Sequence, residues 1–270
     1  MAERSSATVQ FSVVTPTLDS ARFLAGTMRS VAAQRREGLR VEHIVVDGGS
    51  KDETPDIVAA FAHPDTAFVR QTDAGGAAAA INQGLRMARG ETLCWLNSDD
   101  LHGPGALERA GETLRRHPRA AFAFGRCRIV DARGEEIRRG VTAFKNAWFP
   151  FSSHFAIRLL NYISQPAQFF RREAMEKAGA LRTDLTAAWD YDWTLRLWRL
   201  GGGAAIPGAP VSSFRWTPGS ISGANYRKQF AEELAIARAD AGPAALSSLL
   251  HAAVCRGIVF SYDRMTRRKP

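Results

Sequence analysis

The alternation of short apolar runs with helical patterns constrains the fold of this chain more than any other feature. The pattern predicts, in order, a strand, a helix, a strand, a helix, a strand, a helix and a strand at residues 11–15, 23–34, 41–47, 54–62, 68–71, 77–88 and 93–96. Strands alternating with helices at these spacings are typical of βαβ units and a parallel sheet. We therefore expect an α/β fold with a nucleotide-binding sheet in the first half of the chain.

Two of the predicted strands end in carboxylates. One run is followed by Asn97, Ser98 and the adjacent pair Asp99 and Asp100, and another ends at Asp47. An unpaired carboxylate is costly to bury, and Mg²⁺ and Mn²⁺ bind through one or two carboxylates plus substrate phosphates. Ligands of open α/β sheets bind beyond the carboxyl ends of the strands. The pattern favours a cation and nucleotide site there, although a polar turn before a helix N-terminus would also explain the Asp pair.

Charge and motif content restrict the class of partner. The formal net charge of +9 and the pI of about 10.1 favour anionic partners such as nucleotides or phospholipid headgroups. The chain has neither GxGxxG nor GxxxxGK, which leaves a dinucleotide fold and a P-loop unsupported. It also lacks zinc-finger spacing and an RNP-like aromatic run, so we expect no nucleic-acid partner.

Cysteine use and hydropathy indicate the compartment. The three cysteines form no CxxC pair, which is typical of a reducing environment. Residues 1–10 are polar, unlike a signal peptide, and no segment approaches 18 apolar residues. We therefore expect a cytoplasmic protein without a membrane span.

The second half of the chain has a weaker pattern. A strand is predicted over residues 120–130, and residues 142–162 are rich in aromatic residues without a clear period. A short helix is predicted at 173–178, and Asp190 opens an amphipathic helix that continues to Leu200.

A final helix is predicted from Ala244 to Arg264. Its apolar residues fall on one face at the i, i+3, i+4 spacing: Leu246, Leu249, Leu250, Ala253, Val254, Gly257, Ile258 and Ser261. A basic cluster follows at Arg264, Arg267, Arg268 and Lys269. Either this face packs on the rest of the protein, or the helix lies on an anionic bilayer, where each cation contributes about 1 kcal/mol.

Several short motifs together resemble the family 2 glycosyltransferases of the bacterial cell-envelope and exopolysaccharide type. They occur in the family's order over about residues 11–222: Val13 to Thr17, Val45 to Asp52, Asn82 to Gly84, Trp95 to Asp100, Gln165 to Arg172 and Asp190 to Leu197. Each motif is modest alone, but their order and spacing are specific.

The resemblance implies a GT-A fold, a Rossmann-like nucleotide-binding α/β/α sandwich, with a C-terminal amphipathic helical extension. Residues 1–222 would form the glycosyltransferase domain and residues 223–270 the extension. Within the domain, about 11–105 would bind the nucleotide-sugar and metal and about 120–222 the acceptor. The implied function is metal-dependent, inverting transfer from a nucleotide-diphosphate sugar, expected to be a UDP-sugar. The acceptor would be a hydroxyl of a glycan or lipid-linked molecule in polysaccharide biosynthesis. Such an enzyme would be cytoplasmic or peripheral at the inner face of the plasma membrane.

The resemblance also implies roles for individual residues. Asp100 would be the direct ligand of Mg²⁺ or Mn²⁺, and Asp99 would contact the metal or the ribose. The donor would also contact Asn82, Asp47 and the turn formed by Thr15, Pro16 and Thr17. Asp190 matches the family's general base, although it could instead cap the helix that it opens. Arg171 and Arg172 could meet a phosphate on the acceptor.

The chain departs from the family pattern at two positions. Ala79 stands where many members carry an Asp, and Asp73 is a displaced candidate for that donor contact. Thr217 stands where many members place a His, which leaves Arg215 and Ser220 as candidate diphosphate contacts.

These departures leave other functions open. A catalytically silent nucleotide-sugar-binding protein would bind a donor without turnover, and Asp190→Asn would have little effect on it. A sugar nucleotidyltransferase would share the sheet and the carboxylates. It would also carry a Gly-rich, basic N-terminal loop, which residues 15–20 do not provide.

Overall fold

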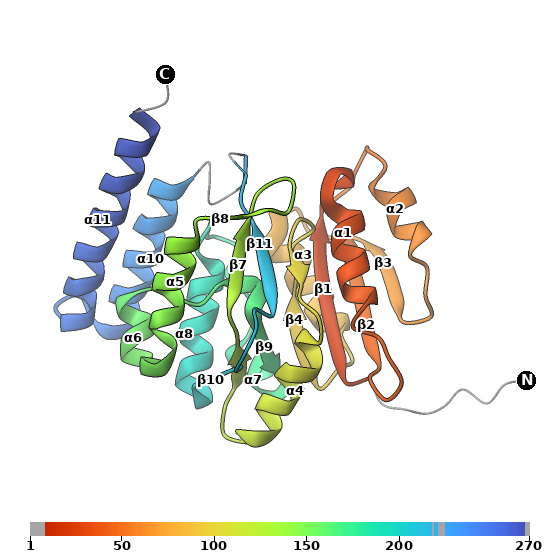
Figure 1. Cartoon of the computed structure of the whole chain (residues 1–270), viewed down its shortest axis with the longest axis horizontal. Coiled ribbons are helices and arrows are strands. Elements are labelled where there is room, and N and C mark those ends of the chain that lie inside the picture. Colours follow the sequence, from red (N-terminus) through yellow and green to blue (C-terminus); the bar gives the residue numbers. More distant parts are fainter. Residues whose placement is uncertain (1–8, 218, 221–224, 268–270) are drawn as a thin grey trace, which may run out of the picture.

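The computed structural model describes residues 9–217, 219–220 and 225–267 and centres on a seven-stranded mixed sheet (Figure 1). The strands lie in the order β10-β6-β9-β4-β1-β2-β3. Their bounds are β1 Phe11–Thr17, β2 Val41–Asp47, β3 Thr66–Arg70, β4 Thr92–Trp95, β6 Phe122–Phe124, β9 Gln168–Arg171 and β10 Gly203–Ala205. Strands β3, β2, β1 and β4 are parallel neighbours, and β9 runs antiparallel to both β4 and β6. The predicted α/β architecture is confirmed.

A four-stranded sheet packs beside the first and changes one prediction. It contains β5 Leu101–His102, β11 Ser212–Arg215, β7 Cys127–Val130 and β8 Glu136–Ile137, in that order. The single strand expected over 120–130 is wrong, because β6 belongs to the large sheet and β7 to the small one. The chain crosses at Gly125, where a Cβ atom would lie 2.5 Å from Val211 Cγ2, so only glycine fits this close crossing.

Helices cover both faces of the large sheet. They are α1 Ala21–Ala32, α2 Thr54–Ala60, α3 Gly76–Met87, α4 Ala106–Arg116, α5 Arg139–Ala147, α6 His154–Leu159, α7 Arg172–Ala178 and α8 Trp189–Gly201. Alternate residues of β1 enter different cores: Val14 packs in the cluster that contains Trp95 and Trp193, and Val13 in the cluster that contains Cys94. Both faces of the central strands are therefore buried, as in an α/β/α sandwich.

The region 142–162, where no period was found, contains short helical pieces. Helix α5, the 3₁₀ turn Phe149–Phe151 and helix α6 follow one another there. A second 3₁₀ turn at Gln165–Ala167 leads into β9.

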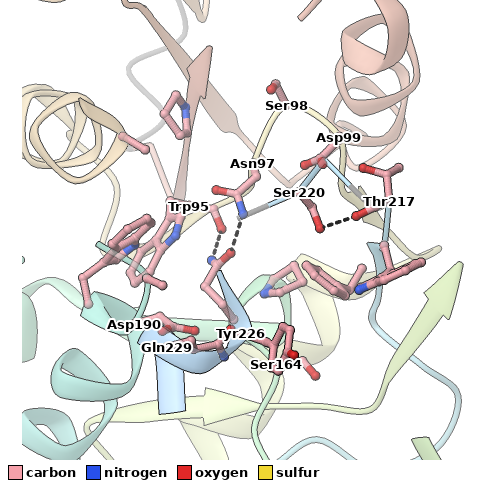
Figure 2. A pocket seen from close by; sticks show the side chains of 18 of the residues that line it. Trp95, Asn97, Ser98, Asp99, Ser164, Asp190, Thr217, Ser220, Tyr226 and Gln229 are labelled. Atoms are coloured by element: carbon pink, nitrogen blue, oxygen red, sulfur yellow. Dashed lines mark hydrogen bonds between the residues drawn. The ribbon is translucent and has the colours of Figure 1, made fainter. Parts of the chain in front are cut away.

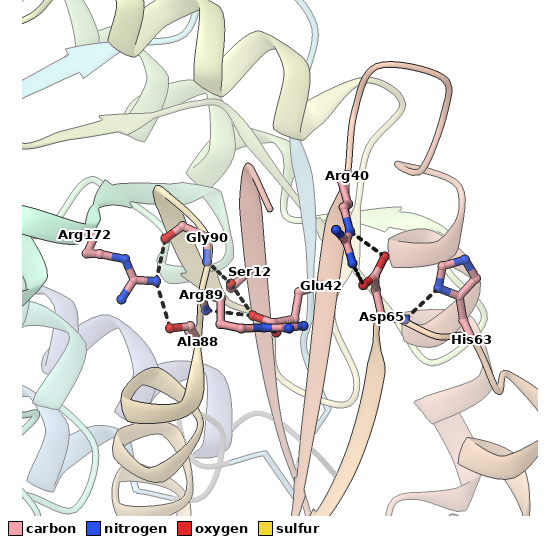
Figure 3. Close-up of polar contacts among 9 residues, drawn as sticks. All are labelled: Ser12, Arg40, Glu42, His63, Asp65, Ala88, Arg89, Gly90 and Arg172. Atoms are coloured by element: carbon pink, nitrogen blue, oxygen red, sulfur yellow. Dashed lines mark hydrogen bonds and ion pairs between the residues drawn. The ribbon is translucent and has the colours of Figure 1, made fainter. Parts of the chain in front are cut away.

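Polar contacts fasten the amino ends of the central strands (Figure 3). The buried Glu42 carboxylate accepts hydrogen bonds from Ser12 Oγ at 2.7 Å and from Arg89 Nε at 2.6 Å. Arg172 donates to the carbonyls of Ala88 at 2.8 Å and Gly90 at 2.6 Å. These contacts lie at the opposite end of the strands from Asp47 and Asp99.

Two long helices end the described chain, α10 Tyr226–Ala241 and α11 Leu246–Arg267. Helix α10 was not predicted. Helix α11 begins close to the predicted start and packs against α10 and α6 (Figure 1). Among the described residues, no helix is both long and apolar enough to span a bilayer. The predicted boundary at residue 222, most of the polar stretch 1–10, and Arg268 and Lys269 of the basic cluster lie outside the described residues.

The predicted apolar face of α11 is only partly turned inward: Val254 and Ile258 pack against the core. The residues that it buries are Ser247, Ser248, His251, Ala252 and Cys255, whereas Leu246, Leu249 and Leu250 are exposed. Small and polar residues face inward because they bond to nearby carbonyls. Ser248 Oγ donates to Gly242 O at 2.8 Å, and His251 Nδ1 donates to Leu159 O at 3.1 Å.

Candidate active site

A cavity of about 1680 Å³ opens at the carboxyl ends of β1, β2 and β4. Its walls come from both halves of the chain, including α5, the start of α8, and the helices α10 and α11. Small-molecule pockets usually measure about 300–1,000 Å³, so this one has room for two substrates side by side. Six of the predicted site residues line it: Pro16, Thr17, Asp73, Asp99, Asp190 and Ser220.

The loop after β4 presents Asp99, rather than Asp100, to the cavity (Figure 2). Asp100 is fully buried, and its Oδ1 accepts the backbone N–H of Arg215 at 2.8 Å. Its other oxygen accepts from Asn97 Nδ2 at 3.3 Å. Burial raises the pKa of Asp100, and burial also raises the pKa of Asp99. The structure thus gives the adjacent carboxylates different surroundings.

Arg215 holds this loop in place. Its Nε donates to the carbonyl of Asp99 at 3.0 Å, its Nη1 donates to the carbonyl of Asp131 at 2.6 Å, and its guanidinium lies over the Phe23 ring. The side chain is buried outside the cavity lining, so the structure does not bring it to the position of a diphosphate contact.

The carboxyl end of β1 supplies one end of the cavity, and Thr15 to Thr17, predicted as a turn, belong to this strand. Pro16 and Thr17 line it, while the buried Thr15 hydroxyl points to β2 and hydrogen-bonds His43 Nε2 at 2.9 Å. Thr17 is buried, and its Oγ1 has no hydrogen-bond partner among the described residues. Such an unpaired hydroxyl is costly, so it is available to a polar ligand.

Asp47 and Asn82 bind the protein's own backbone. The Asp47 carboxylate accepts from the N–H groups of Gly49 and Ser50, both at 3.0 Å. Asn82 makes a reciprocal pair with Leu181, donating to its carbonyl at 2.9 Å and accepting its N–H at 2.8 Å. Neither residue lines the cavity. The structure therefore shows them holding loops around it.

The residues at the two departures from the family pattern lie in different places. Ala79 is buried in α3, where a Cβ on Gly75 would lie 2.6 Å from the Ala79 Cβ. Asp73 lies on the cavity and is exposed, with Arg86 Nη2 at 3.9 Å. Thr217 lines the cavity, and its carbonyl accepts from Ser220 Oγ at 2.7 Å (Figure 2).

Asp190 lies in the first turn of α8 and lines the cavity (Figure 2). Its Oδ1 accepts the N–H of Tyr191 at 2.8 Å, but the N-cap position belongs to Ala188 rather than to Asp190. Burial raises the pKa of Asp190 to about 6, although the Tyr191 N–H and Lys145 oppose the shift. A carboxylate with a pKa near neutrality can accept a proton from a substrate hydroxyl.

Two charged residues beside Asp190 were missed by the sequence analysis. Glu233 of α10 is buried, lines the cavity and has its pKa raised to about 7, first by burial. Lys145 of α5 lines the same region and donates to Ser164 Oγ at 3.2 Å. Burial lowers the pKa of Lys145, whereas Glu233 and Asp190 both act to raise it. Neither residue lies in a family motif. The sequence alone gives no sign that either side chain lies next to Asp190.

The motif from Gln165 to Arg172 positions the loop after β4. Gln165 Nε2 donates to Trp95 O at 2.8 Å, and its Oε1 accepts from Asn97 Nδ2 at 3.3 Å. Arg171 donates to Ala120 O at 2.9 Å. Arg171 and Arg172 thus bind carbonyls away from the cavity, and the idea that they contact an acceptor phosphate finds no support in the structure.

The donor set at Asp99 fits a divalent cation bound with substrate. Among the described residues, no group of three or more His, Cys, Asp or Glu side chains could hold a metal ion. Mg²⁺ usually keeps several waters and binds through one or two carboxylates plus phosphates. One carboxylate on a cavity large enough for a nucleotide is consistent with that mode.

Sequence comparison gives the family. The family model described as glycosyl transferase family 2 matches residues 12–179 of this chain. An uncharacterized glycosyltransferase of Mycobacterium tuberculosis is 33% identical over 190 residues, covering 68% of this chain and 67% of its own length. The family match over residues 12–179 contains Asp47 and Asp99, whereas Asp190 and Glu233 lie beyond it.

Solved structures share the fold. S. aureus TarS 1-349 in complex with UDP-GlcNAc aligns with a TM-score of 0.69 and 19% identity, covering 90% of this chain and 68% of that one. A mannosyltransferase from Pyrobaculum calidifontis, in complex with GDP-Man and Mn²⁺, aligns with a TM-score of 0.65 and 20% identity, covering 98% and 82%. Together with the family match, the sheet topology and the cavity at the strand ends, these similarities show that this chain belongs to glycosyl transferase family 2 and is a glycosyltransferase with the GT-A fold.

Proposed function

We propose that this glycosyltransferase is metal-dependent and inverting, and that it moves a sugar from a nucleotide-diphosphate donor to a hydroxyl of a glycan or lipid-linked acceptor. The observation that carries the proposal is the shared cavity: Asp99 from the end of β4 and Asp190 from the start of α8 both line it. Solved structures of the same fold contain UDP-GlcNAc or GDP-Man. We assign a UDP-sugar as the donor and polysaccharide assembly at the cytoplasmic side of the membrane as the setting.

The donor would bind between the carboxyl end of β1 and the loop after β4. Thr17 offers an unpaired buried hydroxyl to the nucleotide, and Asp73 lies on the same side of the cavity. Asp99 would hold Mg²⁺ or Mn²⁺, with Asp100 and Arg215 fixing the loop behind it. The bound cation would neutralise charge on the departing diphosphate.

Asp190 would act as the general base. Its carboxylate takes the proton of the acceptor hydroxyl as that oxygen bonds to the anomeric carbon of the donor sugar. The bond from the anomeric carbon to the diphosphate oxygen breaks on the opposite side, and the nucleoside diphosphate leaves with the bonding electrons. The configuration at the anomeric carbon is thereby inverted.

Residues after about 222 would complete the acceptor end. Glu233 of α10 lines the cavity next to Lys145, and both interact electrostatically with Asp190. Asn161 and Gln229 donate to the same Glu233 oxygen, Oε1, at 3.3 and 3.1 Å. Among the described residues no donor reaches Oε2, which could therefore accept a second hydroxyl of the acceptor. We propose a glycosyltransferase domain up to about residue 222 and an extension over 223–270 that contributes to acceptor binding.

A donor panel tests the proposal. Release of nucleoside diphosphate from UDP-, GDP- and dTDP-sugars would be followed with Mg²⁺, with Mn²⁺ and with a chelator. We expect one nucleotide class to be cleaved slowly by water in a metal-dependent way, with loss of cleavage in Asp99→Asn and Asp190→Asn. The exposed Asp56→Asn on α2 is the matched control and should keep wild-type activity.

Two further assays separate the alternatives. Donor binding in calorimetry without any cleavage would favour a silent nucleotide-sugar-binding protein. Formation of a sugar nucleotide from a sugar phosphate and a nucleoside triphosphate would instead favour a nucleotidyltransferase.

A further inference from the structure

The outward face of α11 is apolar, although it faces solvent. Leu246, Leu249 and Leu250 are 63%, 56% and 40% exposed, and Ala253 is exposed on the same face. Their i, i+3, i+4 and i+7 spacing places them on one stripe of the helix. We call these four residues the α11 stripe. Single exposed apolar residues are common, but a row of them along one helix indicates a contact surface.

The buried side of α11 shows that this orientation is fixed. Ser248 and His251 hydrogen-bond to backbone carbonyls, and the His251 ring stacks on Tyr191 at 5.8 Å between centroids. Turning the helix to bury the α11 stripe would break these contacts and leave the carbonyls unpaired. The stripe is therefore a feature of the folded protein.

The charge around the α11 stripe indicates what kind of surface binds it. Arg256 is exposed one turn beyond Ala253, and α11 also carries Arg264 and Arg267 against a single acidic residue, Asp263. The chain as a whole has a net charge of +9. An apolar stripe with an exposed arginine beside it, on a chain of strongly positive net charge, complements an anionic bilayer. A second copy docked through the same face would bring these cations together across an isologous interface, which disfavours self-association.

We propose that α11 docks this protein on anionic phospholipid membranes through the α11 stripe. Val254, Cys255 and Ile258 of the same helix line the cavity that holds Asp190. Docking through the stripe would therefore hold the α11 wall of the cavity next to the bilayer. An acceptor anchored in the membrane could then reach Asp190; this last step rests on the proposed function, whereas the docking surface does not.

The test is co-sedimentation of the full chain with vesicles. Phosphatidylcholine vesicles with and without phosphatidylglycerol would be compared for wild type, for Leu246→Gln/Leu249→Gln and for Arg256→Gln. The matched control is Met87→Gln/Leu200→Gln, which changes two exposed apolar residues on α3 and α8. Thermal melting of each variant checks that it is folded.

The expected result is binding to the anionic vesicles only. Binding should weaken at least tenfold in the stripe variant, about fivefold in Arg256→Gln, since each cation contributes about 1 kcal/mol at an anionic surface, and not at all in the control. Failure of the wild type to bind, or undiminished binding of the folded stripe variant, would overturn the proposal. A dimer in sedimentation velocity that the stripe variant dissociates would show that a second copy is the occupant instead.

Donor cleavage in solution keeps the two proposals separate. The stripe variant should cleave the donor at the wild-type rate when no vesicles are present. Vesicle binding without any donor cleavage would reject the proposed function and leave the docking surface standing.

Discussion

At the scale of single residues, the cavity separates two acidic positions with different surroundings. Asp99 lies on a loop fixed by Asn97, Gln165 and Arg215, whereas Asp190 lies at a helix start beside Lys145 and Glu233. The first position suits a cation and a diphosphate, and the second suits proton transfer. Pairs of titratable groups in different environments often mark separate chemical roles.

The pH dependence of donor cleavage should follow the ionisation of Asp190. Its pKa is raised to about 6, and only the ionised form can accept a proton. Cleavage should therefore be lost as the pH falls through about 6, approaching a tenfold decrease per pH unit below it. A pH series of initial rates measures this, with calorimetry at each pH showing whether the donor still binds. A rate that stays flat well below pH 6, with binding intact, would exclude Asp190 as the base.

Replacing Lys145 should shift the pH at which donor cleavage is lost on the acidic side. The Lys145 ammonium favours the ionised form of Asp190 and so opposes the effect of burial on its pKa. In Lys145→Met the Asp190 pKa should rise, and the midpoint of the pH–rate profile should shift to higher pH. An unchanged midpoint in a variant with wild-type melting behaviour would show that the two side chains are not coupled.

At the scale of elements, the short family motifs act mainly as packing and loop-holding devices. In α3, Asn82 pairs with Leu181, Gln83 Nε2 donates to Arg70 O at 2.8 Å, and Gly84 packs closely on β1. These residues fix the loops at the cavity without lining it. A motif residue can therefore support the site by holding its loops in place, without contacting the cavity.

Gly84→Ala should destabilise the fold. A Cβ at this position would lie 2.4 Å from Val14 Cγ1, and α3 would have to move away from the sheet. We expect a loss of about 1–3 kcal/mol in the free energy of unfolding. Gly140→Ala, in a helix with nothing within 4 Å of the added atom, is the control and should be neutral or stabilising. Denaturant unfolding of both variants decides; equal stability of the two would contradict the predicted close packing.

The sequence predicted the elements whose pattern reflects burial. Strands β1, β2 and β4 are buried along nearly their whole length, and their Val, Ile, Leu and Trp residues made them recognisable despite buried polar residues such as Ser12 and Glu42. It missed the break at Gly125, because β6 and β7 are separated by only two residues and the close contact of Gly125 with Val211 cannot be read from the sequence. It also misjudged part of α11: Val254 and Ile258 of the predicted face pack inward, but Leu246, Leu249 and Leu250 are exposed and Ser248 and His251 are buried in their place.

At the scale of the whole molecule, the cavity is assembled from segments far apart in the chain. The strand ends supply one wall, and α5, α8, α10 and α11 supply the other. The family resemblance named Asp99, Asp100 and Asp190 from local motifs, and of these three Asp99 and Asp190 line the cavity whereas Asp100, the predicted direct metal ligand, does not. Glu233 and Lys145 could not be found in that way, since only the packing of α10 and α5 brings them next to Asp190. The acceptor end therefore depends on tertiary structure more than the donor end does.

The most direct test is a crystal structure of Asp190→Asn with Mn²⁺ and the donor identified by the panel, because the slowed variant should retain the intact sugar nucleotide. We predict a cation within about 2.1 Å of an Asp99 carboxylate oxygen and on the diphosphate. The side of the anomeric carbon that lies opposite the diphosphate should face residue 190 without an intervening group. A diphosphate bound away from Asp99, or a donor whose anomeric carbon is closed off from residue 190, would contradict the assignment of these two carboxylates to one reaction.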